Sequence, residues 1–274
     1  MPQSILSYRK VTNKLCGNFL YDMKLKEIYQ TLLFYLTVPK CACCDGKLSR
    51  KNTALCDSCY GEYLDKKSHE VCSVCFKPLY ECKCSNDYLD RHYVHSLCKI
   101  FRYKPTDADD QKTPQNELVY KIKRGNRRDI VKFIAEEMAE SIKATIKGDV
   151  ADYIITNVPR QKARRKKYGV DHSKEIAKGI GKELSVKYKC LLTSRSKIAQ
   201  KKTRGEGRIK NADFDYKFKG SLKGKRVIIF DDIVTTGASL GACAALIKGL
   251  GAKSVIGACF SIAYKDPGLH FEMY

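Results

Sequence analysis

Four close pairs of cysteines constrain the fold of this chain more than any other feature of its sequence. They divide into two sets of four, with the spacings C-x2-C-x11-C-x2-C and C-x2-C-x6-C-x-C. Thiolates two residues apart converge on one ion, and two such pairs complete a tetrahedral zinc site. The candidate ligands are Cys41, Cys44, Cys56 and Cys59 in the first set, and Cys72, Cys75, Cys82 and Cys84 in the second. We therefore expect one or two structural zinc ions in this region.

A disulfide framework is the alternative use of these cysteines, and it requires an oxidising compartment. The N-terminus lacks an apolar stretch with a small-residue cleavage site, and the longest apolar run, 32–38, is far shorter than the roughly 18 residues of a membrane span. We therefore expect a cytoplasmic protein with no membrane span and with reduced cysteines. Cys43 is an alternative ligand in the first set, and His69, His92 and His95 are alternatives to the cysteines.

The chain divides into three predicted segments. These are an N-terminal extension with an amphipathic helix (1–40), a double zinc-ribbon module (41–90) and an α/β domain (91–274). The middle segment has few large apolar residues, so we expect metal to replace a hydrophobic core there and metal removal to unfold it.

The sequence after the cysteines alternates apolar strands with amphipathic helices. Strands are predicted over 95–103, 153–158, 226–230 and 254–264, and a polar loop over 104–116. Helices are predicted from apolar stripes at Ile130, Ile134, Met138 and Ile142, at Ile176, Ile180 and Leu184 with Ser173 as the cap, and over 239–250 with Gly251 at the C′ position. This order predicts a parallel sheet flanked by helices, with ligands bound at the carboxyl ends of its strands.

The segment VIIFDDIVTTGAS (227–239) contains the chemistry that these strands would present. Backbone N–H groups of its turn, the positive helix end and three hydroxyls make a cradle for a phosphomonoester, and Gly237 allows close backbone approach. Asp231 and Asp232, expected in the loop before the turn, can accept hydrogen bonds from vicinal hydroxyls. Phosphate at one end and a diol at the other describe ribose 5-phosphate. The alternative is an ordinary strand and polar turn of an α/β protein.

This segment resembles the motif with which type I phosphoribosyltransferases bind 5-phosphoribosyl 1-diphosphate (PRPP). The order of amphipathic helix, cysteine pairs and α/β domain narrows the resemblance to the ComF/GntX family, over about residues 28–264. LVYKIKRGNRRDI (118–130) is similar to a helix entry of that family, and NVPRQKARRKKYGVDHSKEIA (157–177) to its VP…R…RGFNQ segment. The usual Arg-Gly-Phe-Asn-Gln is here Tyr-Gly-Val-Asp-His (168–172), a departure that bears on recognition of the base or acceptor.

The resemblance implies that the protein binds PRPP with Mg²⁺ and is a candidate phosphoribosyltransferase. Asp231 and Asp232 are then the catalytic carboxylates on the ribose hydroxyls. The implied phosphate contacts are Thr235, Thr236, Gly237 and Ser239 for the 5′-phosphate, and Pro159, Arg160, Arg164 and Arg165 for the pyrophosphate. Likeness to ComF also implies a role in DNA uptake or handling during natural competence, with single-stranded DNA and a competence helicase as candidate partners. The alternative is a non-catalytic DNA-binding or partner-docking module on a repurposed fold.

A net charge of +22 favours polyanionic partners without choosing among them. Residues 155–210 contain 18 Lys+Arg and 4 Asp+Glu, a net of +14. Part of this charge suits a diphosphate group, and the remainder suits a nucleic-acid backbone. A solvated basic surface is the alternative.

Overall fold

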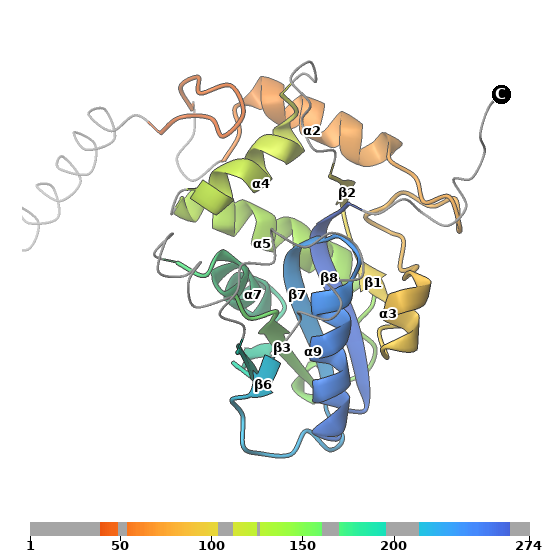
Figure 1. The fold of residues 1–274 in the computed structure, drawn as a ribbon. Helices are drawn as coiled ribbons and strands as arrows, with labels where there is room; N and C mark the ends of the chain where they lie inside the picture. Colours follow the sequence, from red (N-terminus) through yellow and green to blue (C-terminus); the bar gives the residue numbers. More distant parts are fainter. Residues whose placement is uncertain are drawn as a thin grey trace, which may run out of the picture.

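The computed structural model describes residues 39–48, 54–103, 112–124, 127–160, 170–195 and 214–263. Within these residues the main sheet has six strands, and every pairing in it is parallel, as predicted (Figure 1). The strand order is β1-β8-β7-β3-β4. Strand β2 also pairs with β8, nearer the carboxyl end of β8 than β1 does. The strands are β1 (Leu97–Cys98), β2 (Phe101–Arg102), β3 (Tyr153–Asn157), β4 (Lys187–Tyr188), β7 (Arg226–Val234) and β8 (Ser254–Ile262).

The helices beside this sheet form where apolar stripes predicted them, with one addition, α4. They are α4 (Pro114–Arg124), α5 (Arg128–Lys143), α7 (His172–Glu183) and α9 (Ala238–Gly249). After α9, Gly251 adopts φ 89°, the left-handed conformation expected at the C′ position. None of the helices in the described part of the chain has both the length and the apolar character that a membrane span requires.

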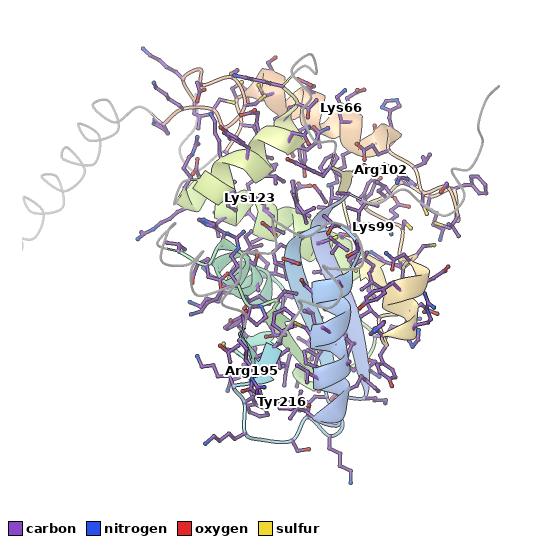
Figure 2. All side chains as sticks on the ribbon, viewed as in Figure 1. Lys66, Lys99, Arg102, Lys123, Arg195 and Tyr216 are labelled. Atoms are coloured by element: carbon purple, nitrogen blue, oxygen red, sulfur yellow. The ribbon has the colours of Figure 1, made fainter. Side chains whose placement is uncertain are left out.

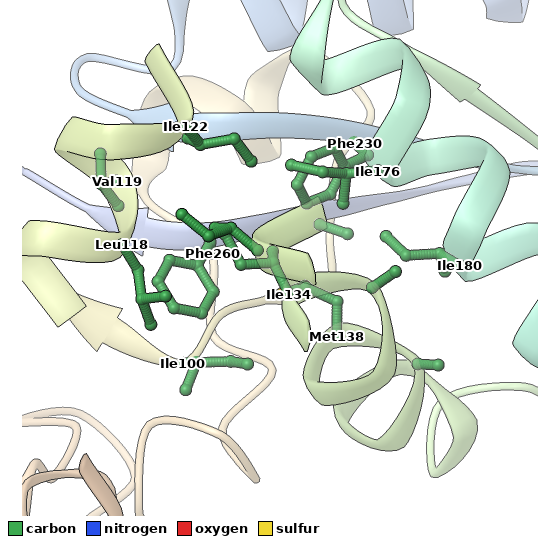
Figure 3. Close-up of a cluster of buried hydrophobic side chains, with 14 of the residues drawn as sticks. Ile100, Leu118, Val119, Ile122, Ile134, Met138, Ile176, Ile180, Phe230 and Phe260 are labelled. Atoms are coloured by element: carbon green, nitrogen blue, oxygen red, sulfur yellow. The ribbon is translucent and has the colours of Figure 1, made fainter. Parts of the chain in front are cut away.

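Alternate residues of the central strands face two different layers. On β7, Ile228 and Phe230 belong to the hydrophobic cluster formed with α4, α5 and α7, whereas Val227 and Ile229 belong to the cluster formed with α9. Figure 3 shows the first of these layers, with Phe230 and Phe260 of the sheet packed among isoleucines of the helices. Burial on both faces explains why these strands are almost continuously apolar.

The short helix α3 (Asp87–Arg91) adds to the α9 layer. Its N-cap is Asn86, whose side chain accepts a hydrogen bond from the Leu89 N–H at 2.8 Å. Leu89 is fully buried in the same cluster as Leu240 of α9. The chain therefore passes from the last cysteine pair directly into a helix that packs on α9.

The first cysteine set shares the core of the α/β layers. Helix α2 (Asp57–His69) contributes Tyr63, whose ring lies 5.0 Å from that of Phe101 and 5.1 Å from that of Phe133 between centroids. The Tyr63 hydroxyl also donates to Glu137 on α5 at 2.8 Å. The second set has only a small separate cluster, formed by Cys72, Leu79 and Cys82. Apolar contacts thus support the first set far more than its composition suggested.

Some of the predicted element boundaries were wrong. The strand expected over 95–103 is two short strands, and the side chain of the intervening Lys99 contacts the second cysteine set. Helix α4 begins at Pro114, inside the loop predicted over 104–116.

The cap of α7 and one hairpin also differ from expectation. Asp171 caps α7 and accepts from the Lys174 N–H at 3.3 Å, so Ser173 lies inside the first turn instead. An antiparallel pair, β5 (Leu192–Ser194) and β6 (Phe214–Tyr216), was not predicted. The helix predicted in 1–40 lies outside the described residues.

Candidate functional site

Two adjacent carboxylates lie near the carboxyl end of the central strand. Strand β7 continues through Asp231 and Asp232 to Val234, because β8 pairs with it along that length and places Cys259 beside Asp231. The prediction that the strand ends at Phe230, with both aspartates in a loop, was therefore wrong. In extended backbone, neighbouring side chains point to opposite faces of the sheet.

Asp232 points to the face covered by α4 and α7, where it meets two positive charges. Its Oδ2 lies 2.7 Å from Nη2 of Arg160, which follows β3. It also lies 3.9 Å from Nζ of Lys123 on α4, a residue labelled in Figure 2. The Asp232 and Arg160 side chains are each 14% exposed. Asp231 is on the α9 face, where it interacts electrostatically with Cys243 of that helix. The two carboxyl groups share a side-chain hydrogen bond, but their other neighbours differ.

These surroundings move the two pKa values in opposite directions. Burial raises the pKa of Asp231 well above its ordinary value, and the charge of Asp232 raises it further. Burial also opposes ionisation of Asp232, but the charges of Lys123 and Arg160 outweigh it and lower the pKa of that carboxyl to about 2. Asp232 therefore ionises first, and Asp231 keeps its proton to higher pH.

The predicted phosphate cradle is the turn between β7 and α9. Gly237 adopts φ 84° at the N-cap of α9, and its carbonyl accepts from the Gly241 N–H at 2.8 Å. The Thr236 hydroxyl accepts from the Ala238 N–H at 3.3 Å. A Cβ at Gly237 would lie 2.7 Å from Cγ of Leu89 on α3, so glycine is required there by both conformation and space. The first turn of α9 contains no acidic residue that would repel an anion.

The structure brings together most of the residues predicted for this site. Thr235, Thr236, Gly237 and Ser239 share the β7–α9 turn, and Pro159 and Arg160 follow the neighbouring strand β3. Arg164 and Arg165 lie outside the described residues. Sequence reasoning missed Lys123 as a neighbour of the carboxylates. Its only signal was its place in the 118–130 segment, since nothing in the sequence shows that α4 ends beside β7.

Each predicted set of four cysteines brings its sulfur atoms together. Within each set the Sγ atoms all lie within 4.8 Å of one another, and those of Cys44 and Cys56 are 3.7 Å apart. Zn–S bonds near 2.3 Å place tetrahedral sulfurs about 3.8 Å apart. In the described part of the chain, these two sets are the groups of metal-ligating side chains that converge in this way. Both could hold a zinc ion.

Backbone N–H groups favour thiolates at these positions. The N–H groups of Cys43 and Cys56 donate to Sγ of Cys41, both at 3.4 Å. Burial opposes ionisation of Cys41, but backbone hydrogen bonds outweigh it and lower its pKa to about 7. In the second set, the N–H of Val74 donates to Sγ of Cys72 in the same way, at 3.4 Å. Burial and neighbouring thiols instead raise the pKa of Cys59 and of Cys84, so the N–H groups favour the thiolate at Cys41, and a bound cation would be needed to hold the other sulfurs as thiolates.

The alternative ligands lie outside these groups. Cys43 is not among the four converging thiols of the first set, although its Sγ contacts Cys59 as well as the Lys112 carbonyl, the latter at 4.0 Å. Nδ1 of each histidine contacts a nearby residue: His69 contacts Asp65, His92 contacts Tyr88 and His95 contacts Asp90.

Lys99 connects the second cysteine set to the sheet. It is 1% exposed, and its Nζ lies 3.2 Å from Sγ of Cys82 and 2.7 Å from the Cys84 carbonyl oxygen (Figure 2). Four thiolates around Zn²⁺ leave a net charge of −2, which a buried ammonium group offsets.

We therefore expect Lys99→Met to accelerate zinc release from the second set by about tenfold, the scale of an outer-shell contact. Release to a chromogenic chelator measures the rate. Lys77→Met is the matched control, because Lys77 is an exposed residue of the same cysteine turn and its loss changes the net charge equally. Equal release from the two variants would contradict this role of Lys99.

Comparisons with known proteins match part of the chain. Residues 144–266 match the family described as the phosphoribosyl transferase domain. Similar solved structures include a purine phosphoribosyltransferase from Pyrococcus horikoshii Ot3, with 20% identity over 49% of this chain and 81% of that chain and a TM-score of 0.32. Another is a hypoxanthine phosphoribosyltransferase from Staphylococcus aureus, with 12% identity over 49% of this chain and 72% of that chain and a TM-score of 0.33. Comparison with curated proteins found no match.

The chain thus contains a phosphoribosyltransferase-type domain at 144–266, built on a parallel sheet flanked by helices. A cysteine-rich region that could bind zinc precedes this domain.

Proposed function

We propose that the carboxyl edge of this sheet binds the ribose 5-phosphate moiety of PRPP. The observation that carries the proposal is the direct connection of β7 to α9. It places two carboxylates and a glycine-containing turn at a helix N-terminus along the carboxyl edge of the sheet. A phosphate suits the turn, because free backbone N–H groups and the helix dipole attract anions. Carboxylates in the last part of β7, a few residues before the turn, suit the ribose hydroxyls.

Each predicted residue has a proposed role in this complex. Thr235, Thr236, Gly237 and Ser239 hold the 5′-phosphate, and Asp231 and Asp232 accept hydrogen bonds from the ribose hydroxyls. Arg160 contacts the diphosphate together with Pro159, Arg164 and Arg165. Because Arg160 is paired with Asp232 in the ligand-free protein, binding exchanges one partner for another. The diphosphate of the ligand then accepts hydrogen bonds from the Arg160 guanidinium, and a ribose hydroxyl donates to the Asp232 carboxylate.

The proposed reaction is transfer of the phosphoribosyl group to an acceptor, with pyrophosphate as the leaving group. Positive charge develops on the ribose in such a transfer, and nearby carboxylates stabilise it. Mg²⁺ arrives with the diphosphate and neutralises part of its charge, and the oxygen ligands of Asp231 and Asp232 are of the kind that this ion prefers. The acceptor is not specified by these residues.

Gly237→Ala tests the phosphate cradle. We expect it to abolish stabilisation by ribose 5-phosphate, because a Cβ there meets Leu89 and the left-handed backbone is strained. At 100 times its dissociation constant the ligand should stabilise the wild type by about 2.7 kcal/mol against thermal unfolding. Gly224→Ala is the matched control, since Gly224 has φ 79° and open space around it. The proposal fails if ribose 5-phosphate stabilises neither wild type nor control, or stabilises all three proteins equally.

A second candidate function, handling of single-stranded DNA in the cytoplasm during natural competence, is supported by the ComF resemblance and by one exposed aromatic residue. Phe76 follows the Cys72–Cys75 pair at φ 58° and is 80% exposed, so its side chain is available for stacking. Phe76→Ser should weaken binding of a single-stranded oligonucleotide, and higher salt should weaken it steeply. Oligonucleotide binding that neither the Phe76→Ser substitution nor higher salt weakens would contradict this role. It would favour docking of a protein partner, such as a competence helicase, as the role of this module.

A further inference from the structure

His172 is an anomalous residue in the stripe with which α7 packs on the sheet. It precedes the buried Ile176 and Ile180 by one and two helical turns, so an apolar side chain would suit its position. The imidazole is 1% exposed, yet neither of its ring nitrogens has a hydrogen-bond partner among the described residues. The next residue, Ser173, is fully buried, and its hydroxyl is likewise unpartnered.

Two unpartnered polar groups at one helix end are costly unless a ligand satisfies them. A buried polar atom without a partner costs about 1–3 kcal/mol, and an apolar residue of similar shape avoids that cost. In the described part of this chain, nothing offers either side chain a compensating bond. The N-terminus of a helix also presents unpaired backbone N–H groups, which attract anions.

The position of this helix end ties it to the carboxylate site. Strand β3 pairs with β7 up to Asn157 and Phe230, so Arg160 and Asp232 lie just past the paired ends of the two strands. Helix α7 begins at the same edge and covers the face toward which Asp232 points. His172 is close enough to both charged groups for their charges to affect its pKa. Burial lowers the pKa of His172, the Arg160 charge lowers it further, and the Asp232 charge opposes the change. The imidazole is therefore neutral at neutral pH and has one N–H to donate.

We propose that His172 and Ser173 bind an oxygen of the diphosphate group at this edge, beside Arg160. This inference rests on the proposed function and adds to it two diphosphate contacts, whereas the sequence connected the 168–172 segment with recognition of the base or acceptor. A neutral imidazole N–H and a hydroxyl at a helix N-terminus, next to a guanidinium, form a donor-rich site for a polyphosphate oxygen. The contact involves the diphosphate end of the ligand and leaves the 5′-phosphate cradle at α9 unaffected.

The test is calorimetric titration of the zinc-loaded protein with magnesium pyrophosphate and, separately, with ribose 5-phosphate. We expect His172→Phe to weaken pyrophosphate binding at least tenfold and to leave ribose 5-phosphate binding unchanged. The same variant should melt at the same or a higher temperature without ligand, because it removes an unpartnered polar group from a buried site. His172→Gln restores a donor and should stay within about threefold of wild type, since it restores the bond.

Ser173→Ala is the second variant, because it removes a hydroxyl with almost no change in volume, and it should also weaken pyrophosphate selectively. Wild-type pyrophosphate affinity in both His172→Phe and Ser173→Ala overturns the inference. So does an equal loss of both ligands with a lower melting temperature, which is the mark of a structural role. Wild type that binds ribose 5-phosphate but not pyrophosphate refutes this inference alone, whereas wild type that binds neither refutes the proposed function as well.

Discussion

Asp232→Asn is expected to destabilise the ligand-free protein by about 2 kcal/mol at pH 7, whereas Asp231→Asn is expected to stabilise it. Removing the Asp232 charge leaves Arg160 largely buried without its partner, and breaking such a pair is costly. The estimate is reduced because both side chains retain some exposure. Asp231 is half-buried, and its burial and the charge of the adjacent Asp232 both raise its pKa, so a neutral amide removes an unfavourable ionisation. Chemical denaturation of the two variants in magnesium-free buffer measures both effects.

The pH dependence of these two effects differs in sign. The folded-state pKa of Asp232 is about 2, below the ordinary 3.8, so its contribution is present above about pH 3.8 and is lost as the pH falls toward 2. The folded-state pKa of Asp231 is raised, so its contribution is fully favourable below pH 3.8 and is lost as the pH rises through the raised value. The gain from Asp231→Asn should therefore shrink as the pH is lowered toward 4. Destabilisation by both variants at pH 7 would contradict the assigned surroundings.

Loss of the first cysteine set is expected to unfold much more of the protein than loss of the second. Cys59 and the nearby Tyr63 belong to the same core as Phe101 and Phe133, so this metal site supports the packing of α2 on α5. Structural zinc contributes about 10–16 kcal/mol in small domains, more than most proteins have as total stability. Cys59→Ser should therefore abolish cooperative thermal unfolding of the whole chain.

Cys72→Ser is the matched comparison, because Cys72 is likewise a buried candidate ligand of its set. Its cluster is separate from the main core, so the expected effect is local loss of structure near Lys99 and α3. Calorimetry gives the global transition, and hydrogen exchange locates the local one. If both variants unfold globally, or if only Cys72→Ser does, the core does not divide in the way described.

The sequence predicted the parts of this protein that depend on local chemistry. The cysteine spacings predicted the two ligand groups, because a tetrahedral ion requires closely spaced pairs. The apolar stripes predicted α5 and α7 because helical periodicity reports burial. The strand-to-helix segment 227–239 predicted the turn around Gly237, because a left-handed backbone at a helix start requires glycine.

Long-range packing was beyond that reasoning. Asp231 and Asp232 lie in a strand because β8 pairs with β7 as far as Val234. The other edge of β8 pairs with β1 and β2, which lie more than a hundred residues earlier in the sequence. The approach of Lys123 to Asp232 requires α4 and β7 to share a layer, and no local pattern states this. The contact of Leu89 with Gly237 likewise joins the end of the cysteine region to the phosphate turn through three-dimensional packing.

The measurement that tests the central claim most directly is calorimetric titration of the zinc-loaded protein with PRPP and Mg²⁺, beside the double variant Asp231→Asn/Asp232→Asn. We predict saturable binding to the wild type and none to the double variant, because the ribose hydroxyls would lose their carboxylate acceptors. Circular dichroism of both proteins shows whether the variant is folded. Absence of binding to a folded wild type, or equal binding to both proteins, would contradict a phosphoribosyl site at this edge of the sheet.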